Sequence, residues 1–331
     1  MPAAHRSLAM YVAPPPRSVR ISLTDRCDLA CVYCRPSRSD GYLEERLDEP
    51  SWRSMIEGLR HAGVRRVRVT GGEPLLHPRV VEMVSYVSSL GFEDVALTTN
   101  GTRLERLAAP LHAAGLMRLT ISIDSLLPDR FRRVTRGGDL DRVLAGVAAA
   151  LAAGFSEMKL NCVVLRGEND DELESITEWA WARGITPRFI ELMPIGEGAN
   201  IVGRHLVTAA EMRERLAELL EPVEARVDAD RGPAKYVRSR RDPRLRVGFI
   251  TGTSDTFCES CDRLRVAADG MLRPCLATDV GVSAKAVAST GDMALIAGAI
   301  DAAWRLKPDG TVWKGCTEET AARVSMRAIG G

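Results

Sequence analysis

Length and composition indicate a globular chain with no general affinity for nucleic acid or membranes. The 331 residues are 45% hydrophobic, so the chain can bury a large core as one elaborated barrel or as two lobes. Lys and Arg (45) nearly cancel Asp and Glu (44), and the net charge of +1 gives no overall field that attracts polyanions. Any anion-binding site must therefore be local.

The pattern of apolar residues predicts neither export nor membrane anchoring. The stretch from Met1 to Arg20 contains three consecutive prolines but no sustained apolar segment. The Ala-rich segment Val143–Phe155 is too short and too weakly apolar to cross a bilayer. We therefore expect a cytoplasmic protein, in which sets of cysteines bind metals more often than they form disulfides.

From Val19 to Leu192, a short β-rich run is followed six times by a segment with helical character. This alternation predicts an α/β fold with a parallel sheet and right-handed crossovers. Six such units form an open doubly wound sheet or an incomplete barrel, and in both the chemistry collects at the carboxyl ends of the strands. The predicted strands are Val19–Leu23, Arg66–Thr70, Asp94–Thr98, Arg118–Ile123, Met158–Val164 and Pro187–Leu192, and the predicted helices are Ser51–Ala62, Pro78–Leu90, Arg103–Ala114, Leu140–Ala153, Asp170–Arg183 and Ala209–Leu220.

The alternation stops after Leu220. A Pro- and Arg-rich stretch follows and leads to a second small region that carries the later cysteines. We therefore predict a partial barrel over residues 1–220 and an appended module over residues 221–331. The motifs at the ends of the first four strands are a cysteine-rich loop, Gly71–Pro74, Thr99–Gly101 and Asp124–Ser125.

Six of the eight cysteines form two sets of three. The first cysteine set is Cys27, Cys31 and Cys34, and the second cysteine set is Cys258, Cys261 and Cys275. A four-iron, four-sulfur cluster held by three cysteines leaves one iron open to bind a reacting molecule. Structural zinc is the lesser alternative, because the chain has only five histidines and none stands beside the first loop. Cys162 and Cys316 fit neither set, and we expect both to be small, buried apolar residues.

The first cysteine set lies in the sequence Thr24–Cys34, which resembles the signature of the radical S-adenosylmethionine (SAM) enzymes. The resemblance implies an incomplete (β/α)6 parallel barrel. It also implies that the open iron binds SAM, which is cleaved after one-electron reduction to a 5′-deoxyadenosyl radical. Gly71–Pro74 is similar to that family's GGEP loop, which meets the methionyl amino group. By the same resemblance, the SAM-binding residues are Tyr33, Gly72, Ser122 and Met193.

The region around the second cysteine set resembles one branch of these enzymes, the GTP 3′,8-cyclases of molybdenum cofactor biosynthesis. Gly248–Ile250 precedes the set, and Arg263 and Arg265 alternate after Cys261 as they would on one face of a strand. In that branch the second 4Fe-4S cluster binds the guanine ring and arginines hold the triphosphate, which suits the forked guanidinium. The resemblance implies that the GTP-binding residues are Arg20, Arg68, Thr99, Lys159, Arg188, Arg263 and Arg265, with Asn161 a further contact.

A buried cation gives independent support for an interior anion site. Lys159 and Arg188 fall inside predicted buried strands, where a positive charge needs a partner.

The final residues Gly330 and Gly331 also resemble the branch, whose tail inserts into the active site. Two glycines can enter a narrow cavity without a side-chain clash.

The resemblance implies a radical lyase that converts GTP to (8S)-3′,8-cyclo-7,8-dihydroguanosine 5′-triphosphate. Its implied partners are an electron donor such as flavodoxin or ferredoxin, a downstream cyclic pyranopterin monophosphate synthase, and a second copy in a homodimer. Two alternatives stay open. One is a two-cluster radical maturase that acts on a peptide or another metabolite and has no use for Arg263 and Arg265. The other is a non-catalytic iron-sulfur or zinc regulator, which would not bind SAM.

Three positions depart from the pattern of the branch. Asp28 and Asp262 stand where the branch usually has asparagine, and Arg35 replaces the usual methionine. An aspartate still accepts hydrogen bonds but adds negative charge near the cysteines. We expect these changes to shift a cluster's potential or affinity, and they leave room for a divergent paralogue.

Overall fold

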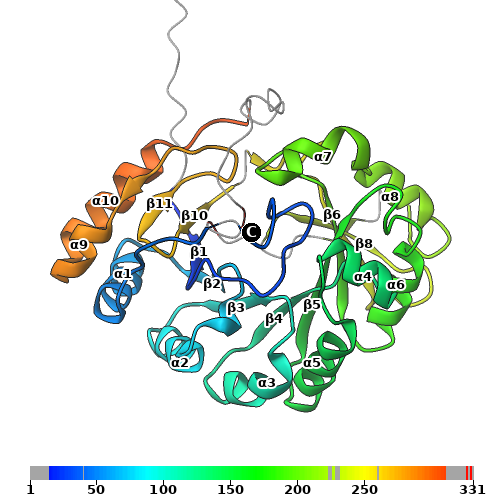
Figure 1. The fold of residues 1–331 in the computed structure, drawn as a ribbon, viewed down its shortest axis with the longest axis horizontal. Coiled ribbons are helices and arrows are strands. Elements are labelled where there is room, and N and C mark those ends of the chain that lie inside the picture. The colour runs from blue at the N-terminus through cyan, green and yellow to red at the C-terminus, as the bar shows by residue number, and fades with distance from the viewer. Residues whose placement is uncertain are drawn as a thin grey trace, which may run out of the picture.

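One curved sheet organises the chain, with helices along its outer face (Figure 1). The computed structural model describes residues 15–39, 41–222, 226–227, 232–258 and 261–310, together with Met326 and Ile329. The strand order in the sheet is β12-β11-β10-β1-β2-β3-β4-β5-β6-β9-β8-β7. Within it, β1 to β6 are parallel and follow one another in chain order.

The six predicted strands and the helices after them are confirmed, with boundaries that differ by a few residues. Two short helices, α4 (Pro128–Val134) and α7 (Glu197–His205), were not predicted. The strands are β1 (Ser18–Ser22), β2 (Arg66–Thr70), β3 (Asp94–Thr99), β4 (Arg118–Ser122), β5 (Glu157–Val164) and β6 (Thr186–Glu191), and the helices are α1 (Glu49–His61), α2 (Val80–Ser89), α3 (Leu104–Ala113), α5 (Leu140–Ala152), α6 (Leu173–Trp181) and α8 (Ala209–Arg215).

Residues after 220 extend both edges of this parallel sheet. Strand β9 (Arg246–Ile250) pairs in parallel with β6, and β10 (Arg263–Val266) pairs in parallel with β1. The later cysteines are thereby brought back to the same sheet as the first set. The remaining strands are antiparallel additions: β7 (Arg226–Val227) and β8 (Ala234–Arg238) beyond β9, and β11 (Met271–Arg273) and β12 (Val282–Ser283) beyond β10.

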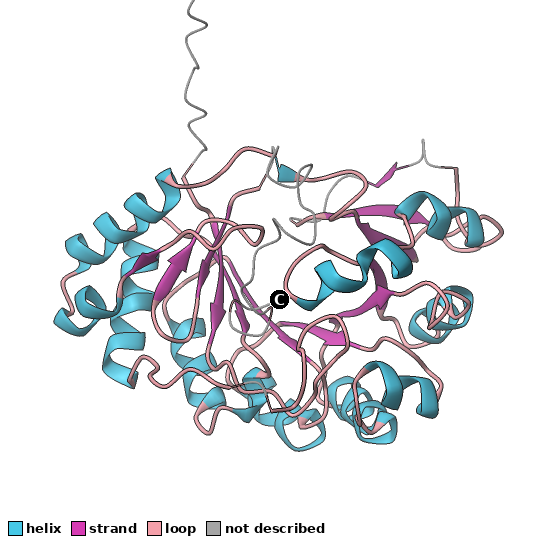
Figure 2. Ribbon diagram, turned by 45° about the horizontal axis from the view of Figure 1, so that its top comes forward, coloured by secondary structure: helices cyan, strands magenta, loops and turns pink. Residues whose placement is uncertain are grey.

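The helices α9 (Lys285–Thr290) and α10 (Met293–Arg305) pack near α1 on the outside of the sheet (Figure 2). Helix α10 begins at Asp292, whose carboxylate accepts hydrogen bonds from two first-turn N–H groups, as expected of an N-cap. Ile296 and Ile300 on one face of α10 are buried, and Ile296 lies so close to Gly58 of α1 that a side chain there would clash. The second region is therefore fixed to the barrel by an apolar helix contact.

Alternation along the strands divides the sheet into an apolar outer face and a polar inner face. In β1, Val19 and Ile21 are 1% exposed and belong to the main core, whereas Arg20 lines the interior cavity. In β2, Val67 and Val69 belong to the core and Arg68 lines the cavity. Because a parallel sheet covered by helices is normally apolar on both faces, the polar inner face marks the interior as a binding site.

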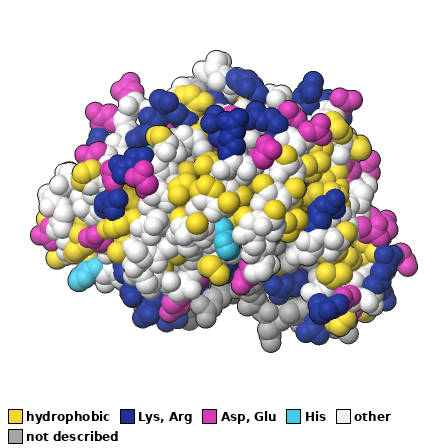
Figure 3. Space-filling view, turned by 90° about the horizontal axis from the view of Figure 1, so that it is seen from below, with side chains coloured by type: hydrophobic (Ala, Val, Ile, Leu, Met, Phe, Trp, Pro, Cys, Tyr) yellow, Lys and Arg dark blue, Asp and Glu magenta, His cyan; other side chains and the backbone are white. Residues whose placement is uncertain are grey.

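The face of the molecule seen in Figure 3 carries no dominant charge of one sign. Figure 3 shows acidic and basic side chains interspersed over one face of the molecule, with hydrophobic side chains between them. This agrees with the net charge of +1. No helix in the described part of the chain is both long and apolar enough to cross a membrane.

Candidate active site

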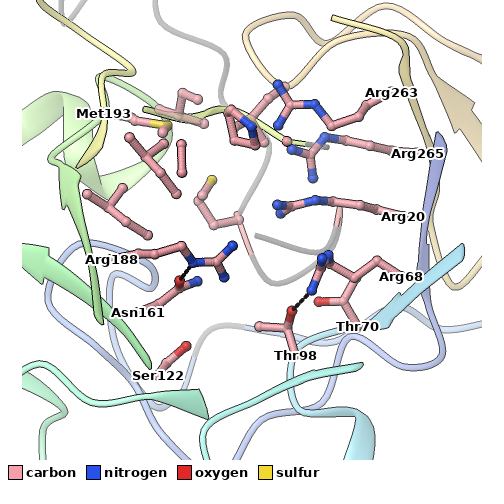
Figure 4. Close-up of a pocket in the computed structure, with 18 of the residues that line it drawn as sticks. Arg20, Arg68, Thr70, Thr98, Ser122, Asn161, Arg188, Met193, Arg263 and Arg265 are labelled. Atoms are coloured by element: carbon pink, nitrogen blue, oxygen red, sulfur yellow. Dashed lines mark hydrogen bonds between the residues drawn. The ribbon is translucent and has the colours of Figure 1, made fainter. Parts of the chain in front are cut away.

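A pocket inside the curved sheet brings both cysteine sets and the predicted cations together. Its walls come from strands β1 to β6, β9 and β10 and from the loops at their ends. Figure 4 shows Arg20, Arg68, Arg263 and Arg265 reaching into the pocket from one side and Arg188 from the other. The pocket lining includes all six cysteines of the two sets and every predicted SAM- and GTP-binding residue: Arg20, Tyr33, Arg68, Gly72, Thr99, Ser122, Lys159, Asn161, Arg188, Met193, Arg263 and Arg265.

The first cysteine set lies on the loop after β1, and the segment after α4 holds that loop in place. The N–H groups of Ala30 and Val32 donate to the carbonyls of Thr135 and Val134. Burial raises the pKa of Cys27, and the carboxylates of Glu73 and Asp28 and the thiol of Cys34 add to the effect. Burial likewise raises the pKa of Cys31, with contributions from Asp124 and the other two thiols. The three sulfurs are thus close neighbours in a site that disfavours free thiolates.

The donor set of this loop suits an iron-sulfur cluster. Three cysteine thiols are the ligand type that holds a four-iron, four-sulfur cluster, and all three line the same pocket. Bound iron would also supply the positive charge that these thiolates lack.

The loop after β2 packs backbone to backbone against the start of the first cysteine loop. The N–H of Gly72 donates to the carbonyl of Thr24 at 2.6 Å, and the N–H of Glu73 donates to the carbonyl of Arg26 at 2.7 Å. A Cβ at Gly72 would lie 2.4 Å from the carbonyl oxygen of Arg26, so only glycine allows this approach. The close packing of the two loops therefore explains why position 72 must be glycine.

Glu73, in the loop after β2, links this loop to the loop after β3 through hydrogen bonds. Its carboxylate accepts hydrogen bonds from the hydroxyl of Thr99 at 2.7 Å and from the N–H groups of Asn100 and Leu75. Burial raises the pKa of Glu73 to about 7, although these hydrogen bonds lower it. Thr99, a predicted GTP contact, thus lines the pocket while its hydroxyl donates to Glu73.

The predicted SAM-binding residues lie at the carboxyl ends of their strands. The hydroxyl of Tyr33 donates to Asp124 at 2.7 Å, and Ser122 ends β4 beside it. Met193 follows β6 and packs in an apolar cluster with Cys258 and Cys275. These residues therefore span the space between the two cysteine sets.

Three arginines form a row across adjacent strands, and we call Arg265, Arg20 and Arg68 the arginine row. Arg20 on β1 is the register partner of Arg265 on β10 and of Arg68 on β2. Burial lowers the pKa of Arg20 well below its ordinary value, and the charges of Arg265, Arg263, Arg68 and Arg188 lower it further. Like charges this close are costly unless an anion joins them, so the row fits a polyanionic ligand.

Hydroxyl and amide groups orient the cations from the facing strands. Arg188 donates to the side-chain oxygen of Asn161 at 2.9 Å and to the hydroxyl of Thr120 at 3.2 Å. Arg68 donates to the same Thr120 hydroxyl at 3.3 Å. Gly248 on β9 leaves room for Arg188, since a Cβ there would lie 2.8 Å from its side chain. These partners are uncharged, so they position the guanidinium groups without neutralising their positive charge.

Two cysteines of the second set differ in their electrostatic setting: burial raises the pKa of Cys258, whereas the pKa of Cys261 is lowered. Burial opposes ionisation of Cys261, but the charges of Arg263 and Lys307 and hydrogen bonds from Arg263 lower its pKa to about 7. Arg265 donates to the carbonyl of Ile329 at 3.0 Å, which places a residue near the carboxyl terminus beside the arginine row. Gly330, Gly331 and Cys316 lie outside the described residues. Cys162 is fully buried, as predicted.

Two buried carboxylates also hold the site together: Asp124, which sequence analysis placed at the end of the fourth strand without a role, and Glu191, which it missed. Asp124 accepts from Tyr33 and from the N–H of Val163, and burial raises its pKa to about 6. Glu191 at the end of β6 accepts from the N–H groups of Thr253 and Ser254, on the loop that leads to Cys258. For both, the only available signal was a carboxylate at the end of a predicted buried strand.

Comparison with known proteins identifies the family. The chain matches the family model "Radical SAM superfamily" over residues 21–180 and "Molybdenum Cofactor Synthesis C" over residues 185–313. A GTP 3′,8-cyclase of Pseudomonas syringae is 41% identical over 305 residues, which cover 88% of this chain and 89% of that protein. A GTP 3′,8-cyclase of Pelotomaculum thermopropionicum is 42% identical over 298 residues, covering 88% and 91%. The chain belongs to the GTP 3′,8-cyclase family.

Solved structures confirm the predicted fold class. Streptococcus suis SuiB bound to S-adenosylmethionine matches with a TM-score of 0.62 and 13% identity, over 93% of this chain and 76% of that one. SuiB bound to precursor peptide SuiA matches with a TM-score of 0.63 and 14% identity, over 91% and 66%. At such low identity, the likeness concerns the fold alone.

The three side chains that the sequence analysis expected to depart from the pattern, Asp28, Asp262 and Arg35, all have partners in the structure. Asp28 accepts from the side chains of Asn100 at 2.8 Å and Thr102 at 2.7 Å. Asp262 forms an ion pair with Arg66. Arg35 is 2% exposed, and it donates to the carbonyls of Cys27 and Arg38 around the first cysteine loop. Local hydrogen bonds or an ion pair therefore hold each of these side chains.

Proposed function

We propose that this chain is a radical SAM lyase that converts GTP to (8S)-3′,8-cyclo-7,8-dihydroguanosine 5′-triphosphate, the first step of molybdenum cofactor biosynthesis. The observation that carries the proposal is the arginine row, which lies in a pocket that both cysteine sets also line. A triphosphate carries close to four negative charges, and the forked guanidinium groups match its oxygens. A peptide maturase would have no use for this buried row.

Two 4Fe-4S clusters and SAM are the cofactors. The first cysteine set would hold one cluster and the second cysteine set the other, because each offers three cysteines around the same pocket. The Gly72 loop would meet the methionyl group of SAM, since its bare backbone faces the pocket beside the first set. When bound, the first cluster and SAM supply the deoxyadenosyl radical that removes the ribose 3′ hydrogen.

The protein residues contribute binding, orientation and exclusion of water. Arg20, Arg68, Lys159, Arg188, Arg263 and Arg265 hold the triphosphate from several strands, so the ribose is fixed relative to the carboxyl ends of β1 to β6. Ribose C3′ and guanine C8 belong to the same GTP molecule, so fixed placement holds that molecule in the conformation in which these two atoms can form a bond. The enclosing sheet keeps competing C–H groups and water away from the reacting atoms.

The partners follow from the chemistry. A one-electron donor such as flavodoxin or ferredoxin supplies the electrons, and a cyclic pyranopterin monophosphate synthase takes the product onward. We further propose a homodimer in the cytoplasm, where thiols stay reduced and available to bind iron.

We also propose that residues 1–220 form the barrel and residues 221–331 form the appended module. The strands of the second part join the same sheet as the barrel, so the two parts share one sheet.

One experiment tests the proposal directly. The protein is reconstituted with iron and sulfide without oxygen, given GTP, SAM and a strong reductant, and analysed by liquid chromatography and mass spectrometry. A new nucleotide isomeric with GTP, formed in step with 5′-deoxyadenosine, supports the cyclase. Deoxyadenosine without that nucleotide points to another substrate, and neither product from a protein that holds both clusters points to a regulator.

A further inference from the structure

A lysine that no sequence motif predicted lies against the second cysteine set. The ammonium of Lys307 donates to Sγ of Cys261 at 3.4 Å, to the carbonyl of Arg263 at 3.4 Å and to the carbonyl of Pro274 at 2.9 Å. An ammonium has three N–H donors, so these three acceptors use the whole group. One acceptor belongs to Cys261, and another belongs to the residue directly before Cys275.

The end of helix α10 directs Lys307 to this position. The backbone N–H of Lys307 donates to the carbonyl of Trp304 at 3.0 Å, and its ammonium lies 4.4 Å from the centroid of the Trp304 ring. The chain then continues along the cysteines, because a Cβ at Gly310 would lie 3.1 Å from Cβ of Cys258. The segment 307–310 therefore forms one wall of the site around the second cysteine set, and Lys307, Pro308 and Asp309 also line the pocket.

The choice of lysine at this position is itself informative. Only five of the 45 basic residues are lysines, so this chain nearly always uses arginine where it places a cation. A guanidinium is a flat fork suited to two parallel bonds, whereas an ammonium is a compact point charge with three donors that diverge. A sulfur and two carbonyls from separate segments surround Nζ of Lys307, and that arrangement matches the ammonium.

We propose that Lys307 is a positioning residue for the second cluster. It joins the start of β10, which follows Cys261, to the turn that carries Cys275, and its charge stabilises the thiolates of the set. The proposal rests on the proposed function, which assigns Cys258, Cys261 and Cys275 to a cluster. A reduced cluster carries one more negative charge than an oxidised one, so loss of the cation should make reduction harder and lower the potential.

The test is made on the full chain, reconstituted without oxygen. In a background where the first cysteine set is replaced by alanine, only the second cluster contributes to the electron paramagnetic resonance signal. There, Lys307→Met should lower the iron content of the second cluster and shift its midpoint potential to a more negative value. Lys307→Arg restores the charge without the three-way geometry, so it should return the potential toward that of the parent while the iron content recovers only in part.

A second readout uses the chain with both cysteine sets intact. Lys307→Met should raise the dissociation constant for GTP by about five-fold or more, the effect of losing hydrogen bonds from a charged group. SAM cleavage without GTP depends on the first cluster and should keep its rate. Lys285→Met is the matched control, because Lys285 is an exposed lysine paired with Glu45, and it should leave every measurement unchanged.

The possible outcomes distinguish a role of Lys307 at the second cluster from a role in binding the triphosphate. An unchanged iron content and potential in Lys307→Met overturns it. Weaker GTP binding with an unchanged second cluster also overturns it and assigns Lys307 to the triphosphate instead. If the parent protein itself binds no second cluster, the proposed function is wrong as well. This result differs from a failure of the Lys307 proposal alone, in which the parent binds the cluster and Lys307→Met has no effect on it. If Lys307→Met does not fold, as judged by its thermal unfolding, Lys307→Gln is measured in the same way.

Discussion

Arg20 on β1 and Arg265 on β10 are register partners in adjacent parallel strands, and after burial the charge of Arg265 is the largest cause that lowers the pKa of Arg20. Burial and the charge of Arg263 also lower the pKa of Arg265, to about 10. The protein therefore holds two cations side by side at a cost to its stability. A ligand with several negative charges removes that cost, so stability and GTP binding should oppose each other at these positions.

Arg20→Met should stabilise the ligand-free protein and weaken GTP binding. Removal of a buried charge that its neighbours repel gains on the order of 1 kcal/mol in the free energy of unfolding. The dissociation constant for GTP should rise about ten-fold or more, since a charge-assisted pair is lost. Thermal unfolding with and without GTP measures both effects. Arg244→Met, at an exposed arginine paired with Asp242, is the control, and a lower melting temperature for Arg20→Met would contradict the argument.

Gly72→Ala should destabilise the protein and abolish SAM cleavage. The new Cβ would lie 2.4 Å from the carbonyl oxygen of Arg26 and 2.7 Å from that of Asp25, and neither backbone atom can move without shifting the first cysteine loop. The expected loss is about 1–3 kcal/mol in the free energy of unfolding, measured by urea denaturation. Gly203→Ala in α7 is the matched control, because nothing lies within 4 Å of its added Cβ. Equal effects of the two changes would rule out the steric reason.

Six β/α units could be predicted because each strand and helix carries its own local pattern of apolar residues. The position of Arg20 beside Arg265 could not, because it depends on β10 pairing with β1 across most of the chain. Local patterns do not encode that register. Contacts such as Glu191 with Thr253 and Lys307 with Cys261 join segments far apart in sequence, and their residue types are common in surface loops. The cysteines were predictable because their spacing alone limits what they can bind.

The pH dependence of stability should reveal the buried carboxyl of Glu73. Burial raises its pKa from an ordinary 4.5 to about 7. Between these values the folded protein keeps a proton that the unfolded chain has released, so the free energy of unfolding falls as pH rises. A shift of this size limits the effect to about 3 kcal/mol, nearly complete at pH 7. Glu73→Gln cannot titrate, so the stability of the parent relative to this variant should decline from pH 4.5 to 7.

Urea unfolding of the cluster-free, reduced protein at several pH values measures that difference. Glu105→Gln, at an exposed carboxylate on α3, is the control and should give a difference that is flat with pH. A flat difference for Glu73→Gln would instead show that the carboxyl is ionised throughout, held by the donors of Thr99, Asn100 and Leu75.

Asp28→Asn should raise the reduction potential of the first cluster without unfolding the loop. The carboxylate of Asp28 accepts from the side chains of Asn100 and Thr102, and an asparagine oxygen can keep one of these bonds. The Asn100 amide also lies 3.9 Å from Sγ of Cys27, so the lost negative charge is close to the site of reduction. Its removal favours the reduced cluster by on the order of 1 kcal/mol, or about 40 mV for one electron.

The shift is measured by a redox titration that follows the electron paramagnetic resonance signal, in a background where the second cysteine set is replaced by alanine. Asp129→Asn removes a charge of the same kind from an exposed position on α4 and should leave the potential unchanged. Equal potentials for Asp28→Asn and its parent would mean that the hydrogen bonds from Asn100 and Thr102 already screen the charge of the carboxylate. Asp28 would then act through its hydrogen bonds alone, and its charge would have no effect on electron transfer.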